Sequence, residues 1–289
     1  MTAIAPTIDG VAPPVQAPSR PGTGGVSAVL TLARRRMALV ARTPREIIVP
    51  LMAPLLFALI VAPALEETFP SAPGGIDYMT FVTLSAIGLL VPLNAMNAGL
   101  GVVVDRLNGA QRDLLAAPVS RASIVAGNLL VAVGLSALQV TVLLGAASLR
   151  GAELELGASG VAWFVAGTLA FAVAMYAIAE VLANRIPTQE EYIGALPAIA
   201  IVPYFVAGGL FPLSALPAGL TAIAKAVPLT HVIALMRYGL MDEGGAGLHD
   251  IWGMDDATTM AALSLGFVVV FALAFTALAV RTFKRAAVS

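Results

Sequence analysis

The chain has 289 residues, of which 59% are apolar and 11% are charged, whereas soluble domains carry about 25% charged residues. Together with several apolar stretches of about 20 residues, this composition excludes an ordinary soluble domain and indicates a bundle of membrane-spanning helices. A formal net charge of −1 gives no basic excess of the kind that nucleic-acid binding requires, and the absence of cysteine excludes disulfides, thiolate metal sites and cysteine nucleophiles.

The N-terminal region divides into a tail and a basic segment. Residues 1–25 are rich in Pro, Ala, Gly and Ser and do not resemble a signal peptide, so we interpret them as a disordered cytoplasmic tail. Residues 26–45 combine apolar positions with five arginines, a pattern that predicts an amphipathic helix lying along the membrane surface. We interpret residues 26–289 as one all-α transmembrane domain.

Six apolar stretches are predicted to cross the bilayer. The first contains Pro50 and Pro54, which a membrane helix tolerates where its neighbours satisfy the freed carbonyls. Because the number of spans is even, both termini lie on one side. The predicted spans are 47–64, 79–103, 124–147, 161–182, 192–210 and 258–280.

The basic residues of the predicted loops are distributed unevenly. Arg150, Lys225 and Arg237 lie on one side, and the other 13 of the 16 Lys and Arg residues lie on the side of the termini. Because basic residues concentrate in cytoplasmic loops, both termini are predicted to be cytoplasmic. Alanine is abundant and arginine outnumbers lysine, which indicates a bacterial chain and hence the bacterial cytoplasmic membrane.

A polar segment, 105–123, connects the second and third predicted spans. It carries charges of both signs and keeps apolar residues at Leu107, Leu114, Leu115 and Val119, with Pro118 as a stop for the helix. We interpret the segment as a short helix beneath the membrane that could transmit the closure of a cytoplasmic partner. The alternative is an ordinary solvated loop.

The longest predicted outer loop, 211–257, is mostly apolar between residues 213 and 241. Pro217 and Pro228 interrupt that stretch. We therefore predict two short helices that dip into the outer leaflet, and the alternative is a plain apolar loop packed on the bundle.

No nucleotide-binding P-loop is present in the sequence. The pattern GxxxxGK[ST] needs a lysine after glycine, but the two lysines follow Ala224 and Phe283. If the chain serves an ATP-driven process, a separate subunit that docks on the cytoplasmic face must hydrolyse the ATP.

Two motifs are similar to those of a known family. The run DRLNGAQRDLLAAPVSR at 105–121 resembles the cytoplasmic signature of the type-2 ABC exporter permeases, the daunorubicin-resistance and nodulation-polysaccharide export class. FPLSALP at 211–217, PLT at 228–230 and ALMR at 234–237 are similar to the outer region of that family after the fifth span. The sequence departs from the family pattern at Asp105, where Glu is commoner, and at Ala110 and Ala117, where Thr is frequent.

The resemblance implies a permease subunit, without catalytic residues, of an exporter of drugs, antibiotics, lipids or lipid-linked glycans. It implies a second permease copy or paralogue in a homo- or heterodimer, and a separate ABC ATPase that holds ATP and Mg, with no cofactor and no metal in this chain. The residues predicted to couple to the ATPase are Arg106, Gly109, Leu114, Leu115, Pro118, Ser120 and Arg121. The residues predicted to form the outer re-entrant region are Phe211, Pro212, Pro217, Pro228 and Arg237.

Polar residues inside the predicted spans have two interpretations. Asn94 and Asn97 share a face of the second span, and Gln139 lies in the third; such residues most often join helices, and the alternative is a transport path. Glu180 lies near the cytoplasmic end of the fourth span, where we expect it to be exposed or paired with Arg185. It is also the one candidate carrier for the alternative function, a proton-coupled secondary transporter.

Overall fold

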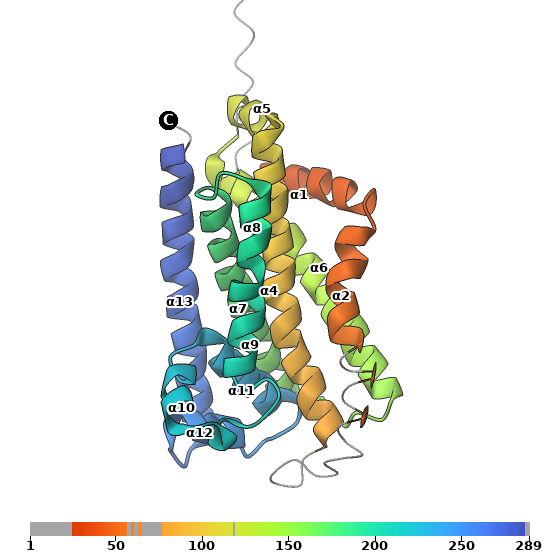
Figure 1. The fold of residues 1–289 in the computed structure, drawn as a ribbon, viewed down its shortest axis with the longest axis vertical. Helices are drawn as coiled ribbons and strands as arrows, with labels where there is room; N and C mark the ends of the chain where they lie inside the picture. Colours follow the sequence, from red (N-terminus) through yellow and green to blue (C-terminus); the bar gives the residue numbers. More distant parts are fainter. Residues whose placement is uncertain (1–24, 57–58, 61–62, 65–76, 118, 287–289) are drawn as a thin grey trace, which may run out of the picture.

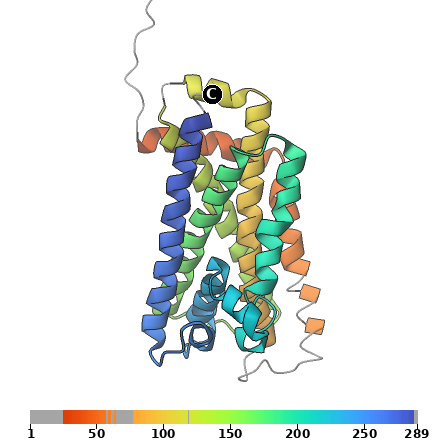
Figure 2. The ribbon, with the colours of Figure 1, turned by 60° about the vertical axis from the view of Figure 1, so that its left-hand side comes forward.

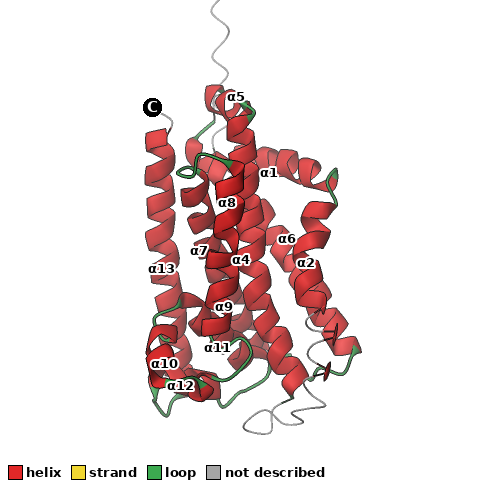
Figure 3. Ribbon diagram, in the orientation of Figure 1, coloured by secondary structure: helices red, strands yellow, loops and turns green. Residues whose placement is uncertain are grey.

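The computed structural model describes residues 25–56, 59–60, 63–64, 77–117 and 119–286, and within these ranges the regular structure is entirely helical (Figure 3). The predicted tail, 1–25, lies almost wholly outside the described residues. The long helices stand side by side, and shorter helices gather at the two ends of the bundle (Figures 1 and 2).

Four described helices are long and apolar enough to cross a membrane: α4 (Tyr78–Leu107), α6 (Arg121–Leu149), α7 (Ala158–Ala183) and α13 (Ala257–Ala286). They coincide with the second, third, fourth and sixth predicted spans.

Aspartates cap two of these helices. The Asp77 carboxylate accepts hydrogen bonds from the backbone N–H groups of the first turn of α4, and Asp256 does the same for α13. Hydrogen bonds from the hydroxyl and backbone N–H of Thr259 lower the pKa of the exposed Asp256 carboxyl, because they favour its ionised form.

The other two predicted spans differ from a single straight α-helix. The helix α2 (Arg45–Leu56) begins the first predicted span, and much of the remainder of that span lies outside the described residues. The fifth predicted span contains three helical segments in direct succession: α8 (Gln189–Leu196), the π-helical segment η2 (Pro197–Ile201) and α9 (Val202–Val206). Two prolines without backbone N–H groups, Pro197 and Pro203, accompany the change of helix type.

One end of the bundle, here called the α5 end, holds α1 (Val26–Ala41), α5 (Ala110–Ala116) and the C-terminal end of α13 (Figure 1). The helix α1 lies across the ends of the long helices instead of continuing them (Figure 1). Both ends of the described chain are therefore at the α5 end.

The opposite end, here called the α11 end, holds the short helices that lie between α9 and α13 in the chain (Figure 1). After a 3₁₀ turn η3 (Leu213–Ala215), the predicted pair of short helices is present as α10 (Ala218–Ala224) and α11 (Pro228–Leu240), which meet at 84°. By length and composition this bent pair could count as a fifth span. A third short helix, α12 (Ala246–Trp252), was not predicted; it lies between glycines in the left-handed conformation.

The helix α7 lies at the centre of the bundle, where it contacts α4, α11 and α13. The helix α4 is buried along much of its length, with Leu84, Ile87, Leu90 and Met96 fully enclosed. By contrast, α6 and α13 leave large apolar side chains exposed on their outer faces, as helices that face lipid do. Packing in the core therefore fixes the positions of α4 and α7. The candidate functional residues lie near the two ends of the bundle, where these helices end.

Candidate functional site

At the α5 end, the chain leaves α4 through a tight turn at Gly109. Its φ of +79° is left-handed, and nothing lies within 4 Å of the position that a Cβ would take, so the backbone conformation and not the space favours glycine here. The helix α5 follows directly. Ser120 then caps α6 by accepting a hydrogen bond from the Ser123 backbone N–H at 3.0 Å.

Arg106 connects the end of α4 to the segment that follows α7. Its guanidinium donates to the carbonyl oxygens of Ala183 at 2.6 Å, Ile186 at 2.5 Å and Pro187 at 3.2 Å. These carbonyls lie at and just beyond the C-terminal end of α7, where backbone acceptors lack helical partners. Arg106 therefore faces the bundle and holds the base of α5 in place.

The other predicted coupling residues are only partly covered by the structure. Leu114 is half-buried on α5, and Arg121 is the first residue of α6. Pro118 and the side chain of Leu115 lie outside what the structure describes.

A second contact at the α5 end was not anticipated from the sequence. Arg36, on α1, forms an ion pair with Asp105 on α4 at 3.4 Å, and the two side chains are 12% and 20% exposed. The guanidinium passes over Gly101, where a Cβ would lie 1.4 Å from Nη2 of Arg36. The available signal was Gly101 one helical turn before Asp105, a small residue that leaves room beside a charged one.

Two of the three predicted path residues are hydrogen-bonded to each other. The Asn94 side-chain amide donates to Gln139 and to the Ser136 hydroxyl, and Gln139 donates to the Ile47 carbonyl at 2.5 Å. Asn94 and Gln139 thus join α4, α6 and α2 to one another, as intramembrane amides commonly do. Asn97 and Asn94 both line a small cavity, together with Arg36 and Asn128.

The predicted position of Glu180 was wrong. The residue is 1% exposed, and no ion pair joins it to Arg185, which is exposed. Within the described residues, its carboxyl accepts hydrogen bonds from the Tyr176 hydroxyl at 3.1 Å and the Asn184 side chain at 3.2 Å. These two residues lie one helical turn away on either side, so α7 itself supplies the partners that a buried carboxyl needs.

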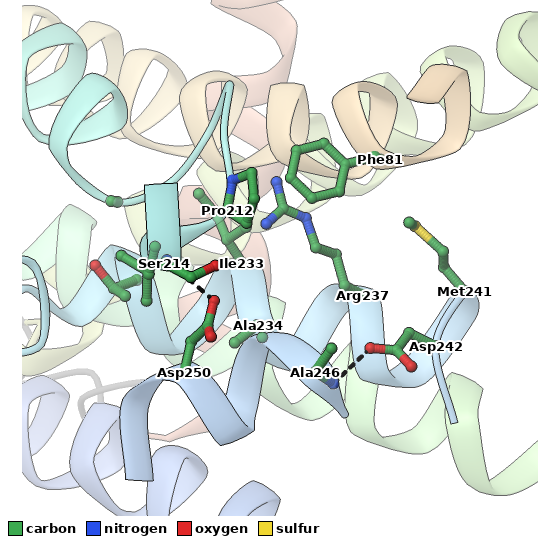
Figure 4. Close-up of a pocket in the computed structure, with 14 residues that line it drawn as sticks. Phe81, Pro212, Ser214, Ile233, Ala234, Arg237, Met241, Asp242, Ala246 and Asp250 are labelled. Atoms are coloured by element: carbon green, nitrogen blue, oxygen red, sulfur yellow. Dashed lines mark hydrogen bonds between the residues drawn. The ribbon is translucent and has the colours of Figure 1, made fainter. Parts of the chain in front are cut away.

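Arg237 is the central residue of the α11 end (Figure 4). It is 8% exposed, and its guanidinium carbon lies 3.3 Å from the centroid of the Phe81 ring. Nη2 donates to the Ser85 hydroxyl at 2.5 Å and to the Gly208 carbonyl at 2.9 Å. The side chain therefore joins α11 to α4 and to the turn after α9. Phe81 and Ser85, one turn apart on α4, were not anticipated from the sequence.

The remaining residues of the predicted outer region are spread over this end. Pro212 lies beside the Arg237 guanidinium at one cavity (Figure 4). Phe211 is 53% exposed, Pro217 precedes α10 and Pro228 is the first residue of α11, the position where a missing N–H is harmless. Of the five, the structure brings only Pro212 and Arg237 together.

The fold and these contacts define an all-helical, multi-pass membrane protein. The profile of the ABC-2 type transporter family matches residues 27–241, well over half of the chain. The chain therefore belongs to the ABC-2 type transporter family and is a permease of the ABC type, a transport component of the membrane. A search of curated proteins found no match.

Proposed function

We propose that the chain is the membrane-spanning subunit of an ATP-driven exporter that moves drugs, antibiotics, lipids or lipid-linked glycans outward. A separate ABC ATPase carries the ATP and Mg, and a second permease copy or paralogue completes a twelve-helix pathway. Family membership and the motif at 105–121 support the ATPase partnership. The daunorubicin-resistance and nodulation-polysaccharide motifs are the basis for the substrate class.

The proposed topology has six spans and cytoplasmic termini in a bacterial cytoplasmic membrane. Both ends of the described chain lie at the α5 end (Figure 1), which requires an even number of crossings. The segment from Gln189 to Val206 has 18 helical positions, about 27 Å at 1.5 Å per residue, close to the bilayer core. It would be the fifth span, and α2 with the residues after it would be the first. In this topology α1 lies on the inner membrane surface.

The main support for the proposal is the set of contacts that holds α5 in position. Gly109 sets the turn into it, Ser120 fixes the chain that leaves it, and Arg106 fastens its base to three carbonyls near α7. The surface at and beside α5 is nevertheless accessible to a partner, because Leu107 is 55% exposed and Arg112 is exposed. A short, rigid helix with an exposed surface is suited to bind an ATPase and to follow its conformational change.

The same geometry separates the roles of the predicted residues. We propose that Arg106, Gly109 and Ser120 position α5, while Arg112 and Leu107 supply contacts to the ATPase. Leu114, Leu115, Pro118 and Arg121 complete the coupling segment. Asn97 lines the same cavity as Asn94 but takes no part in the Asn94–Gln139 hydrogen bond, so it is the better candidate for the transport path.

The experiment is co-purification of the ATPase from native membranes in mild detergent. Arg112→Glu is compared with Arg150→Glu, an exposed arginine at the α11 end that serves as the matched control. We expect an ATPase to co-purify with the wild-type chain and with Arg150→Glu, and to be lost from Arg112→Glu. A chain isolated without any ATPase would overturn the proposal, and equal retention by both variants would remove the coupling role of the α5 surface.

A further inference from the structure

The helix α1 and the turn after it carry positive charge that the rest of the described chain does not neutralise. Residues 26–45 contain five arginines and no acidic residue. Arg36 is paired within the bundle. Arg34, Arg35 and Arg42, here called the basic surface, are exposed and have no carboxylate within ion-pair distance in the described part of the chain. Because like charges repel one another, a negatively charged partner would stabilise this surface.

Contacts with the bundle fix how α1 is rotated about its own axis. Val29 and Leu32 pack on α6 at Gly127, where a Cβ would lie only 2.9 Å from Cβ of Leu32. Arg36 projects from the same face of α1, because it follows Leu32 by four residues, and it reaches α4 to pair with Asp105. The face that carries Leu32 and Arg36 therefore meets the bundle.

The exposed side chains of α1 lie on two further faces. Val26, Leu30 and Met37, here called the apolar strip, lie within about 40° of one another on the helix, and they are 75%, 50% and 40% exposed. Arg35 and Arg42 lie about 150° around the helix from this strip. Basic residues that only keep a segment in the cytoplasm need no apolar strip on another face. Opposed apolar and basic faces are instead typical of a helix that lies in the membrane interface.

The position of α1 along the bundle also matches the interface. Figure 1 shows α1 lying across the ends of the long helices. Its contact at Gly127 falls three residues inside the predicted third span, 124–147, which is about 5 Å at 1.5 Å per residue. An interfacial helix buries its apolar face about 5–10 Å into the boundary between headgroups and acyl chains. The apolar strip thus lies at the level of the acyl chains, and the basic surface at the level of the phosphates.

We propose that α1 is a docking surface for anionic phospholipids. Arg34, Arg35 and Arg42 bind the lipid phosphates, which a guanidinium can hold through two parallel hydrogen bonds, while the apolar strip packs among the acyl chains. A zwitterionic lipid carries its own cation beside the phosphate, so an anionic lipid gains more from the unpaired arginines. The inference goes beyond transport, and it rests on the proposed topology, in which α1 lies on the inner membrane surface.

The test measures which lipid gathers at α1 in liposomes that contain the full-length chain and no ATPase. Because the sequence has no cysteine, Ala38→Cys allows one fluorophore to be attached three or four residues from each arginine of the basic surface. Its quenching is compared between spin-labelled phosphatidylglycerol and phosphatidylcholine that carry the label at the same acyl position. The preference is the ratio of the two lipid fractions that give half-maximal quenching.

The control site is Leu149→Cys, at a 90% exposed position next to the exposed Arg150. It reports the preference that a single arginine produces. We expect the preference for phosphatidylglycerol to be at least about fivefold larger at position 38, because each further arginine at an anionic surface contributes about fivefold. It should fall as salt is added. Equal preference at the two positions would overturn the proposal.

Two pairs of substitutions remove the same charge from opposite ends of the bundle. Arg35→Gln/Arg42→Gln keeps a similar helix propensity and should lower the preference at position 38 at least about fivefold. Arg150→Gln/Lys225→Gln, at exposed positions of the α11 end, should leave it unchanged. Arg35→Lys/Arg42→Lys should retain most of it, because the charge remains. An unchanged preference in the first pair would contradict the assignment.

The rival occupant of the basic surface is the ATPase, so its co-purification is measured with the same variants. Loss of the ATPase from Arg35→Gln/Arg42→Gln with an unchanged lipid preference would overturn the proposal and assign these arginines to the ATPase. The lipid measurement uses neither ATPase nor ATP. A chain that shows the lipid preference but captures no ATPase would therefore refute the exporter proposal alone.

Discussion

Replacing Gly101 by alanine should break the contact between α1 and α4. The new Cβ would lie 1.4 Å from Nη2 of Arg36, so the guanidinium must leave its position over the helix. Because the displaced atom is the end of a flexible side chain, the backbone need not move. The consequence is the loss of the 3.4 Å ion pair with Asp105, with the carboxylate left mostly enclosed.

The expected coupling free energy between positions 36 and 101 is about 1–3 kcal/mol. Exposed ion pairs contribute about 0.2–1 kcal/mol, and breaking a fully buried pair costs about 3–5 kcal/mol; exposures of 12% and 20% place this pair between the two. Alanine also favours a helix over glycine by about 1 kcal/mol. Gly101→Ala should therefore destabilise the wild-type chain only moderately.

The assay is detergent-induced unfolding of the purified chain in a double-mutant cycle with Arg36→Ala. Without the arginine, the steric conflict disappears and only the helix preference of alanine remains, so Gly101→Ala should become stabilising by up to about 1 kcal/mol. The sign of the effect thus reverses between the two backgrounds. Equal destabilisation in both would show that Gly101 is needed for another reason and would refute the reasoning.

Three further predictions concern groups inside the bundle. Glu180→Gln should leave ATP-dependent transport intact, measured as substrate flux; abolished transport would favour the proton-coupled alternative. Gln139→Leu and Asn94→Leu should each destabilise the chain in the same unfolding assay, because each removes two interhelical hydrogen bonds and each lost bond costs about 0.6–2 kcal/mol; a variant of either residue as stable as the wild type would contradict the network. Phe81→Leu removes the ring that faces Arg237 and should cost at least about 2 kcal/mol, whereas the 56% exposed control Phe205→Leu should cost little.

The long helices could be predicted because each depends on its own apolar stretch. In α4, α6, α7 and α13, about 20 consecutive apolar residues suffice to define a span, whatever the neighbouring helices do. The short helices around Pro217 and Pro228 could be predicted because proline limits where a helix can continue. The helix α12 was not predicted because it depends on a left-handed backbone conformation at the glycines that flank it. Glycine permits that conformation but does not require it.

The contacts of the candidate sites could not be predicted in the same way, because their partners are far apart in sequence. Arg36 was one of several arginines on an amphipathic segment, and nothing local to it identifies Asp105 as its partner. Glu180 illustrates the opposite error: proximity in sequence suggested Arg185, yet the helix turns Glu180 towards Tyr176 and Asn184. Periodicity indicates which residues share a face, whereas tertiary packing decides what that face meets.

The helix α4 connects the two candidate sites. Near its C-terminal end, Asp105 holds α1 and Arg106 holds the segment after α7; near its N-terminal end, Phe81 and Ser85 hold Arg237 of α11. A helix of 30 residues extends about 45 Å, enough to cross the bilayer and reach both ends. Because both ends of α4 are anchored through charged side chains, a displacement of α5 that moved α4 would also act on the contacts of Arg237. In the proposed exporter, α4 therefore transmits that displacement to the cavity beside Arg237.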